Sequence, residues 1–546
     1  MSSGVPQVMC IGQARMTAGL DRMDRIDLAS HYQVFGSLPR LTASQLVDMA
    51  EQVDLRGRGG AAFPFGRKMK AVLESRRKRK RKAVVLVNAA EGEPGSAKDQ
   101  MLLLRSPYLV LGGALIAARA LQAEEIVVGV SNPDAAGSVV SAALAEPDLG
   151  RLVRVVQVPD RFVTGEAGAL ANALNGKPPL PPGRKILASD FGVGGQPTLL
   201  SNAETYAQIA VLAMLGPEGF ASTGTADEPG TYLLTVGGSV ERPAVVEVPA
   251  GLPLGEVLDL CLAAPWEGVL VGGYHGMWLP TETAYTVPVS RAGLASAGGV
   301  LGAGVVLPLG EGTCPLGEVA RVARYLASES SGQCGPCKQG LPGIARALAE
   351  LADGSGGVDA LDTARHTAAA VRGRGACAHP DGVFRLVLSA VDVFTDDLTA
   401  HLSRGTCGRP VQGILPLPAE EGQTRLSVDW TRCRGHGLCA HLVPELVQVD
   451  REGYPVFLDM PVPGWLAHEA QQAVQMCPSL ALRLITGAPA PAPRPPAKAK
   501  LAVKKGSNLK LVASKRSESD LSDLDVNEEW IADLSDIGRQ IPRPLT

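Results

Sequence analysis

The stretch LRGRGGAAFPFGRKMKAV (residues 55–72) places Gly57, Gly59 and Gly60 directly before a segment with helical spacing. Because glycine has no Cβ, such a cluster lets backbone N–H groups approach a phosphate or a planar ring. Lys68 follows on the expected helix, where its ammonium group can reach an anion. A glycine cluster by itself is weak evidence, so the segments around it decide what it binds.

Downstream of this stretch, apolar runs that favour strands alternate with a helical pattern. AVVLVNAAEG (83–92) and EEIVVGVSNPD (124–134) are β-branched runs that end in turn residues, and YLVLGGALIAARALQ (108–122) between them has helical spacing. This alternation is typical of a sheet that is covered by helices. We therefore expect an α/β domain over residues 46–225, preceded by an N-terminal segment, 1–45.

The rest of the chain changes composition in steps. Strand-like runs with Gly and Pro between them predict a small strand-rich domain over 228–310. Helical spacing then predicts a helix bundle over 315–412, which includes one helical pattern over 384–402. A small α+β unit is expected over 424–486. A segment rich in Pro, Ala and Lys, followed by an acidic end, predicts a disordered linker and tail over 487–546.

Bulk properties limit the class of protein. The length of 546 residues predicts several domains rather than one core. A formal net charge of −3 predicts no nucleic-acid partner and no general affinity for anionic membranes. No window approaches the ~18 apolar residues of a membrane span, and the N-terminus lacks the pattern of a signal peptide. We expect a cytoplasmic protein, or one that is peripheral to a membrane complex.

One local feature departs from this balance of charge. The run RRKRKRK (76–82) contains only basic residues. We interpret it as a solvated loop between a helix and a strand. A patch for nucleic acid or for a protein partner is the alternative.

The sharpest local pattern among the ten cysteines is CRGHGLC (433–439), which is followed much later by a Cys-Pro pair at Cys477. Cys433 and Cys439 lie on a glycine-bearing loop that can wrap an inorganic core. His436 stands between them, in the place of a further ligand. A remote cysteine followed by proline is typical of ferredoxin cluster sites. Zinc held by the same four side chains, and buried thiols without any metal, are the alternatives.

This block resembles the small single-cluster bacterial ferredoxins. In that family three cysteines hold a [3Fe–4S] core, and a residue at the position of His436 can complete a [4Fe–4S] core. The resemblance implies a small ferredoxin domain at residues 424–486, with Cys433, His436, Cys439 and Cys477 as metal ligands.

Four segments of the α/β region resemble the NADH-binding flavoprotein subunit of complex I, and the related diaphorase subunits of NAD-linked hydrogenases and formate dehydrogenases. These segments are LRGRGGAAFP (55–64), VNAAEGEPG (87–95), TGEAGAL (164–170) and LSNAET (200–205). Their order and spacing agree with the family over residues 40–410. The resemblance implies an α/β flavin domain, then a ubiquitin-like β-grasp (SLBB-like) domain, then a helix bundle that carries one cluster.

The same resemblance implies FMN as cofactor and NAD(P)H as substrate. Cofactor contacts are implied at Gly57, Gly59, Gly60, Lys68, Asn88, Glu91, Gly165, Glu166 and Asn202. Nucleotide contacts are implied at Phe63, which could stack on the adenine, and at Glu93, which could accept a hydrogen bond from a ribose hydroxyl.

Three positions depart from the family pattern. An aspartate of the family is Ala90 here, the second glutamate of its G-E-E turn is Ala167, and the first asparagine of its N-N pair is Ser201. We expect FMN binding to survive these changes. NADH binding is expected to be weaker, altered in preference or lost.

The stretch SSGQCGPCKQG (330–340) corresponds to the family's cluster loop, E-S-C-G-x-C-x-P-C, but its first cysteine is a serine. The implied ligand set is Ser331, Cys334, Cys337 and Cys377. Ligation by the serine oxygen, loss of one iron, completion by His366 or His379, and unligated thiols all remain open. The remaining cysteines are expected to be ordinary thiols: Cys10, Cys261, Cys314 and Cys407.

Together these features predict an electron path. A hydride from NAD(P)H would reduce FMN, and single electrons would pass through the bundle cluster to the ferredoxin module and a downstream partner. That partner could be a ferredoxin-dependent enzyme or a membrane reductase, and binding of a small thioredoxin-like protein is an open question. The alternative is a relay subunit that binds FMN and clusters but not the nucleotide.

Overall fold

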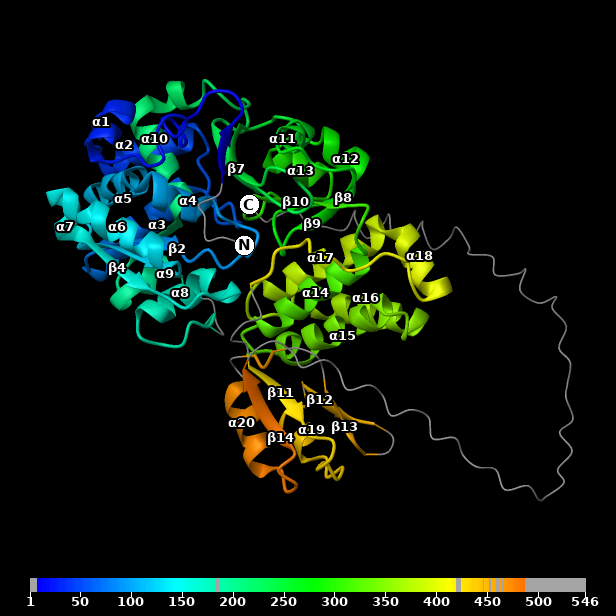
Figure 1. Cartoon of the computed structure of the whole chain (residues 1–546). Helices are drawn as coiled ribbons and strands as arrows, with labels where there is room; N and C mark the ends of the chain where they lie inside the picture. Colours follow the sequence, from blue (N-terminus) through cyan, green and yellow to red (C-terminus); the bar gives the residue numbers. More distant parts are fainter. Residues whose placement is uncertain are drawn as a thin grey trace, which may run out of the picture. The chain divides into compact units, whose positions relative to one another are not determined.

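A parallel sheet of four strands, in the order β4-β3-β2-β5, follows the predicted alternation (Figure 1). β2 (Val84–Ala89) and β3 (Glu125–Val130) lie inside the two predicted strand runs, and α5 (Pro107–Leu121) lies in the helical run between them. β4 (Val153–Gln157) and β5 (Thr198–Asn202) complete the sheet. The β-branched residues of these strands suit a sheet that is buried on both faces.

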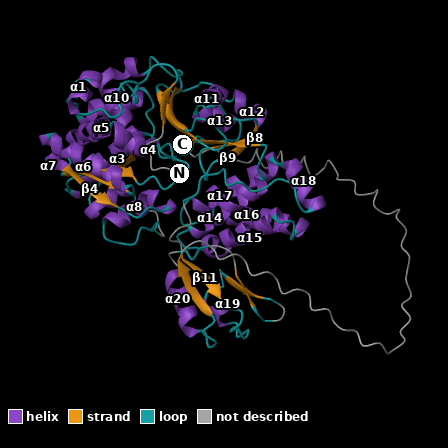
Figure 2. Cartoon of the chain, in the orientation of Figure 1, coloured by secondary structure: helices purple, strands orange, loops and turns teal. Residues whose placement is uncertain are grey.

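Helices cover both faces of this sheet; Figure 2 shows the helices in purple and the strands in orange. Val85 packs into the larger core with α5, whereas Leu86 packs on the other face against Leu170 of α8. At Gly113 of α5 a Cβ would lie 1.8 Å from the carbonyl oxygen of Tyr206, so only glycine allows this helix contact. The helices of this region are α1 (Leu28–Phe35), α2 (Ala43–Gln52), α3 (Phe65–Arg79), α4 (Lys98–Arg105), α6 (Pro133–Ala145), α7 (Pro147–Leu152), α8 (Ala167–Leu174), α9 (Ala188–Phe191) and α10 (Ala203–Phe220).

The next part of the chain forms a mixed sheet in the order β1-β7-β6-β10-β8-β9, with one strand, β1, from the N-terminal segment. Its strands are β1 (Gln7–Cys10), β6 (Thr231–Val236), β7 (Ala244–Pro249), β8 (Trp266–Val271), β9 (Met277–Pro280) and β10 (Val305–Gly310). The short helices α11 (Leu254–Leu260), α12 (Thr281–Thr286) and α13 (Arg291–Ser296) accompany it. The edge strand β1 comes from the N-terminal segment and pairs in parallel with β7, which the sequence did not indicate.

Helices then form the predicted bundle: α14 (Pro315–Ser328), α15 (Leu341–Ala352), α16 (Gly357–Val371), α17 (His379–Val393) and α18 (Thr395–Arg404). The single helical pattern expected over 384–402 is wrong, because α17 ends and α18 begins at Phe394. The backbone of Phe394 is not helical (φ −99°, ψ 47°), and its ring packs 4.9 Å from the ring of Trp278. A tertiary contact therefore breaks a locally continuous pattern.

The last described part of the chain is a small α+β unit. β11 (Thr424–Val428) pairs antiparallel with β14 (Leu482–Thr486), and β12 (Val447–Val449) pairs with β13 (Pro455–Phe457). α19 (Leu438–Leu442) and α20 (Ala467–Met476) accompany these strands. The chain as a whole is thus of mixed α/β class.

This computed structural model describes residues 7–182, 187–418, 424–444, 446–450, 453–457, 461–463 and 466–486. The predicted linker and tail, 487–546, lie outside the described residues. Among those described, no single helix is long and apolar enough to cross a membrane. The pair α4 and α5 passes that test of length and composition only when taken together, with a bend of 95° between the two helices.

The basic run 76–82 begins inside a helix rather than in the expected loop. Arg76 to Arg79 form the last turn of α3, and Lys80 ends it in a left-handed conformation. Basic side chains are favoured there because the carbonyl end of a helix is partially negative. The guanidinium carbon of Arg79 lies 3.7 Å from the centre of the Phe191 ring. A structural role at the helix end therefore accounts for part of this run.

Candidate functional site

The carboxyl edge of the first sheet gathers several of the predicted cofactor residues. Asn88 of β2 and Asn202 of β5 are direct neighbours in the strand register. The Asn88 Nδ2 donates to the carbonyl oxygen of Gly165 at 2.9 Å. A Cβ on Gly59 would lie 3.4 Å from the Asn202 Cβ, so the glycine loop passes directly over this edge. In open parallel sheets ligands bind at such an edge.

The glycine loop itself is a closed turn. The backbone N–H of Gly57 donates to the carbonyl oxygen of Phe63 at 3.0 Å. Gly60 has a φ of +95°, which favours glycine, but Ala62 also has a positive φ of +47°. The Phe63 ring is 50% exposed, so a planar ligand can stack on it.

A cavity of about 200 Å³ opens beside the glycine loop. Its lining includes Gly57, Arg58, Gly60, Ala62, Glu204, Tyr232, Arg291 and Gly302. The Arg58 guanidinium lies 3.9 Å from the centre of the Tyr232 ring, and its Nε is buried without a hydrogen-bond partner among the described residues. Two guanidinium groups and a glycine-lined wall fit an anionic ligand such as a phosphate ester.

Lys68 lies beside the same edge. Its Nζ donates to the carbonyl oxygen of Leu200 at 2.7 Å and lies 3.4 Å from the Ser201 Oγ. Burial lowers the pKa of Lys68 to about 8, because desolvation disfavours the charged ammonium. An anion bound nearby would favour the protonated form, so this lysine is suited to hold a phosphate or an electron-rich ring.

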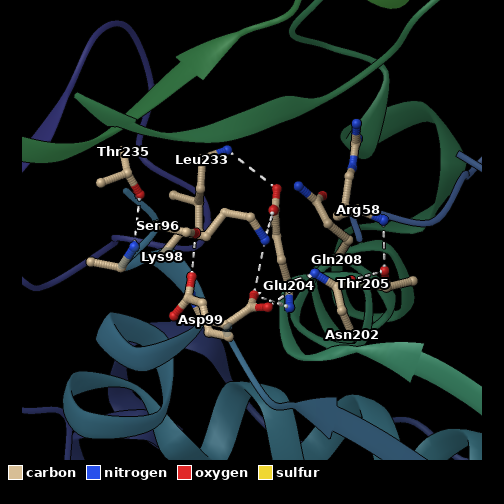
Figure 3. Close-up of polar contacts among 12 residues, drawn as sticks. Arg58, Ser96, Lys98, Asp99, Asn202, Glu204, Thr205, Gln208, Leu233 and Thr235 are labelled. Atoms are coloured by element: carbon tan, nitrogen blue, oxygen red, sulfur yellow. Dashed lines mark hydrogen bonds and ion pairs between the residues drawn. The ribbon is translucent and has the colours of Figure 1, made fainter. Parts of the chain in front are cut away.

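Behind the edge lies a buried ionic network that sequence analysis missed (Figure 3). The Lys98 Nζ lies 3.0 Å from an oxygen of Asp99 and 2.9 Å from an oxygen of Glu204. Asp99 also accepts hydrogen bonds from the Asn202 side chain at 3.2 Å and from the Glu204 backbone at 3.1 Å. The charged pair Lys98–Asp99, placed at the start of an otherwise apolar helical run, was the available signal.

Glu91, a predicted FMN contact, caps α4 in this structure. Its carboxylate accepts hydrogen bonds from the backbone N–H groups of Asp99 at 3.1 Å and Gln100 at 2.8 Å. It also accepts from the Ser96 hydroxyl. Burial, with a further contribution from the Asp99 charge, raises the pKa of Glu91. This side chain therefore positions the helix that carries Asp99.

Glu93, a predicted ribose contact, reaches the loop after β8. Its Oε2 accepts from the Tyr274 backbone N–H at 3.0 Å, and its Oε1 is buried without a partner among the described residues. Burial raises the pKa of Glu93 to about 8. One oxygen is thus fixed by the protein, whereas the other remains available to a donor. The ribose contact stays a prediction.

The segment around Gly165 connects the sheet edge to the bundle. The Glu166 carboxylate accepts from the Ala169 N–H at 2.7 Å and so caps α8. Burial raises the pKa of the Cys377 thiol, and the charge of Glu166 adds a smaller rise. The Phe162 backbone N–H donates to an oxygen of Glu329 at 2.9 Å, directly before the first cysteine loop.

The predicted donors of the bundle are brought together. The Ser331 Oγ lies 3.9 Å from the Cys337 Sγ, and both residues are buried. Burial, with smaller contributions from the thiols of Cys334 and Cys377, raises the pKa of the Cys337 thiol to about 11. Ser331 and Cys337 thus lie together, and the thiols of Cys334 and Cys377 are close enough to affect the pKa of Cys337. Three thiols and one hydroxyl suit an iron–sulfur cluster with a single oxygen ligand.

The two histidine alternatives do not supply a fourth ligand here. The Nδ1 of His379 lies 2.9 Å from the Nε2 of His275, and its Nε2 lies 2.8 Å from the carbonyl oxygen of Leu326. Both ring nitrogens of His379 are therefore engaged. His366 is exposed on α16, with its Nδ1 2.8 Å from the Asp362 carbonyl oxygen. Ser331 is the donor that the fold places with the three cysteines.

The second predicted donor set lines one small cavity of about 20 Å³. Its members are Cys433, His436, Cys439 and Cys477. Gly435 and Gly437 have φ values of +69° and +71°, so the loop curls around the cavity. The His436 Nδ1 lies 3.3 Å from the Ser479 Oγ. Three thiols and an imidazole around an open space fit an iron–sulfur cluster, and their types also suit zinc.

Three family models match this chain. The Nuo51 FMN-binding domain matches residues 50–211, and the NADH-ubiquinone oxidoreductase-F iron-sulfur binding region matches residues 317–401. A 4Fe-4S single cluster domain matches residues 426–484. The matched stretches contain the sheet edge, the bundle donors and the second donor set, so FMN and iron–sulfur clusters are supported as cofactors.

Curated proteins and solved structures give the same picture. The NADH-quinone oxidoreductase subunit designated F of Mycobacterium tuberculosis is 30% identical over 406 residues, which cover 70% of this chain and 90% of that protein. The NADP-reducing hydrogenase subunit HndC of Solidesulfovibrio fructosivorans is 25% identical over 432 residues, covering 76% of this chain and 86% of that protein. A crystal structure of an NAD⁺-reducing [NiFe]-hydrogenase matches with a TM-score of 0.65 at 26% identity, and covers 73% of this chain and 68% of that chain.

Proposed function

Because this chain belongs to the family of the NADH-quinone oxidoreductase subunits designated F, we propose that it accepts a hydride from NAD(P)H on FMN and passes single electrons through iron–sulfur clusters to a downstream acceptor. The family membership confirms the resemblance predicted from the sequence. FMN, when bound, exchanges electron pairs with a nicotinamide and single electrons with a cluster.

One observation carries this proposal: the segment 162–166 contacts both ends of the expected path. Gly165 accepts a hydrogen bond from Asn88 at the sheet edge, and Phe162 of the same segment donates to Glu329, two residues before Ser331 of the cysteine loop. A cofactor at the edge would therefore lie one chain segment away from the first cluster. The short covalent and hydrogen-bonded path supports direct electron transfer between them.

The residues between the two sites are aromatic and closely packed. The Phe162 ring lies 4.7 Å from the ring of His275 and 6.2 Å from the ring of Tyr325. These ring contacts join Phe162 to Tyr325 of α14 in the bundle. At the outer side, Phe63 offers an exposed ring to the nucleotide, and Arg58 and Lys68 offer positive charge to phosphate groups.

A second candidate function is a relay that binds FMN and clusters but no nicotinamide nucleotide. Ala90 and Ala167 favour it, because two carboxylates of the family pattern are missing there. The engagement of Glu93 with the Tyr274 backbone also favours it. In this alternative, electrons would enter and leave through protein partners only.

Anaerobic titration with NADH, and then with NADPH, separates the two functions. Bleaching of the flavin absorbance within mixing time, followed by cluster signals in EPR, is expected for the oxidoreductase. The matched variants Ala90→Asp and Ala167→Glu restore the family carboxylates. If the native chain stays oxidised and the variants bleach, the relay function is correct. A protein purified without flavin would contradict both.

We propose the second donor set as the exit of the path and residues 424–486 as its ferredoxin domain. Cys439→Ala should leave flavin reduction intact and stop the reduction of an external one-electron acceptor. The domain limits 46–225, 228–310 and 315–412, with the SLBB-like assignment of the second, are part of the same proposal. So are a cytoplasmic or membrane-peripheral location and a redox partner protein.

A further inference from the structure

Three side chains that belong to neither cluster set meet at one end of the bundle. They are Cys314 at the start of α14, His401 on α18 and Cys407 in the segment that follows α18. Their ligand atoms all lie within 4.8 Å of one another. Cys314 and His401 are each 3% exposed. The sequence predicted ordinary thiols here, because ninety-three positions separate the two cysteines in the chain.

We propose that Cys314, His401 and Cys407 bind one Zn²⁺ ion. The Sγ of Cys314 lies 3.3 Å from the Nε2 of His401. A sulfur and a nitrogen bound to the same tetrahedral zinc, at the usual bond lengths, lie about 3.6 Å apart. Thiolate and imidazole donors favour zinc over the oxygen-loving cations. Water takes the fourth position, because no carboxylate of the described residues joins the cluster.

The neighbours of the three ligands suit thiolates. The backbone N–H of Gly317 donates to the Cys314 Sγ at 3.4 Å. The Arg409 guanidinium hydrogen-bonds to Cys407, and it also pairs with Asp397 and, at 2.6 Å, with Glu267. Donors placed around the ligands in this way orient metal-bound sulfur atoms and stabilise their negative charge.

The proposed zinc would fix the chain where it leaves the bundle. The Cys314 backbone N–H donates to the Pro410 carbonyl oxygen at 2.9 Å. Glu318, one turn into α14, accepts from the backbone N–H groups of Gly413 at 2.6 Å and Ile414 at 3.1 Å. Residues 407–415 therefore run back along the start of α14. A metal ion that joins Cys407 to Cys314 and His401 would hold this segment in place.

Metal analysis of the full-length chain, purified anaerobically with its flavin and iron, tests the proposal. We expect close to one zinc per chain in addition to iron. The zinc K-edge absorption spectrum does not respond to iron and reports the ligands of zinc alone. It should show sulfur scatterers near 2.3 Å and a shell of lighter atoms near 2.0–2.1 Å. Absence of zinc, or a zinc spectrum without sulfur, overturns the proposal.

Two variants assign the zinc to these residues. Cys314→Ser removes a thiolate but keeps a side chain that caps α14, and Cys407→Ser removes the other. Each should lose the zinc while iron and flavin contents stay unchanged. Cys261→Ser, at a buried thiol outside the cluster, should keep it. Zinc that persists in both variants but disappears in Cys439→Ser belongs to the second donor set and overturns the proposal. So does a Cys314–Cys407 disulfide in the native protein.

Discussion

The sheet edge and the second donor set differ in how their polar side chains are arranged before any cofactor binds. At the edge, the polar side chains are bound to one another: Asn202 donates to Asp99, and Lys98 joins Asp99 to Glu204. In the second donor set, by contrast, the donors surround an open cavity, and Cys477 accepts one backbone N–H, from Ala481 at 3.4 Å.

This difference indicates that one site forms without its ligand, whereas the other is completed only when its metal binds. The edge can reach its final geometry without a ligand, because its buried charges are already paired. A cavity lined by thiols gains much of its stability only when a metal ion binds, because metal binding and folding are coupled there. The bundle donors lie between the extremes, with a serine hydroxyl among buried thiols.

The largest effect is expected from Cys337→Ala. This change removes a fully buried thiol that we propose as a ligand of the bundle cluster, so the whole cluster should be lost. Iron content and EPR before and after reduction measure the loss, and flavin content should remain unchanged. Cys439→Ala is the matched control, since it should remove only the other cluster. Equal iron in Cys337→Ala and the native chain would show that the bundle holds no cluster.

Lys98→Met tests whether the sheet edge has its final geometry without bound flavin. It leaves Asp99 and Glu204 buried without their shared cation, and breaking a buried pair in this way costs about 3–5 kcal/mol. Urea denaturation of the flavin-free and flavin-loaded chains should show a similar loss in both. Arg154→Met, which breaks an exposed pair with Glu125, should cost about 1 kcal/mol or less. A loss seen only with flavin bound would contradict a preformed edge.

Ser331→Cys brings the bundle set closer to a four-cysteine site. Replacing a hard oxygen ligand by a thiolate should raise the midpoint potential, on the order of 100 mV within the range of such clusters. EPR-monitored redox titration gives the value. The potential of the other cluster serves as the internal control. An unchanged bundle potential would indicate that Ser331 is not a ligand in the native protein.

Glu93 predicts a pH dependence of stability. Its pKa is raised from 4.5 to about 8 by burial, so the folded chain binds a proton that the unfolded chain releases between these values. The stabilising effect is complete below pH 4.5 and is lost as the pH rises through 8, by at most about 1.4 kcal/mol per pH unit. Glu93→Gln should flatten the decline in melting temperature between pH 5 and 8. A parallel decline in native chain and variant would assign it to other groups.

Local patterns in the sequence were enough for the elements around the edge and for one donor set. Short apolar runs that end in turn residues predicted β2 and β3, and helical spacing predicted α5; nearly every residue of these elements is buried. Cys433, His436 and Cys439 were predicted from their spacing within one short loop. In both cases the signal itself lies within a short stretch of the chain.

What the sequence did not reveal depends on contacts between distant segments. The burial of Lys98 depends on Glu204, more than a hundred positions away, and the break at Phe394 depends on Trp278. The strand β1 was missed because its partner β7 follows more than two hundred positions later. Neither hydrophobic period nor motif spacing carries information about such pairs.

The smallest effect is expected from Ala62→Gly, in the loop that passes over the edge. Ala62 has a φ of +47°, a conformation that costs an L-residue about 1–2 kcal/mol. Glycine removes this strain but adds freedom to the unfolded chain, worth about 0.4–1 kcal/mol. The net gain in unfolding free energy should therefore be below about 1 kcal/mol, and equal with and without flavin if the loop is preformed.

Lys80→Gly is the matched control for that change, because Lys80 also has a positive φ, of +52°, but ends α3 away from the glycine loop. Both variants should gain similar stability, measured by urea denaturation. Only Ala62→Gly should alter the dissociation constant for FMN, because Ala62 lines the cavity beside the loop. If both variants leave the affinity for FMN unchanged, the residue at position 62 does not affect how the loop contacts FMN. If Ala62→Gly gains stability only when FMN is present, the glycine loop takes its final form on binding. The sheet edge would then depend on its ligand, as the cysteine loops do, although its buried charges are already paired.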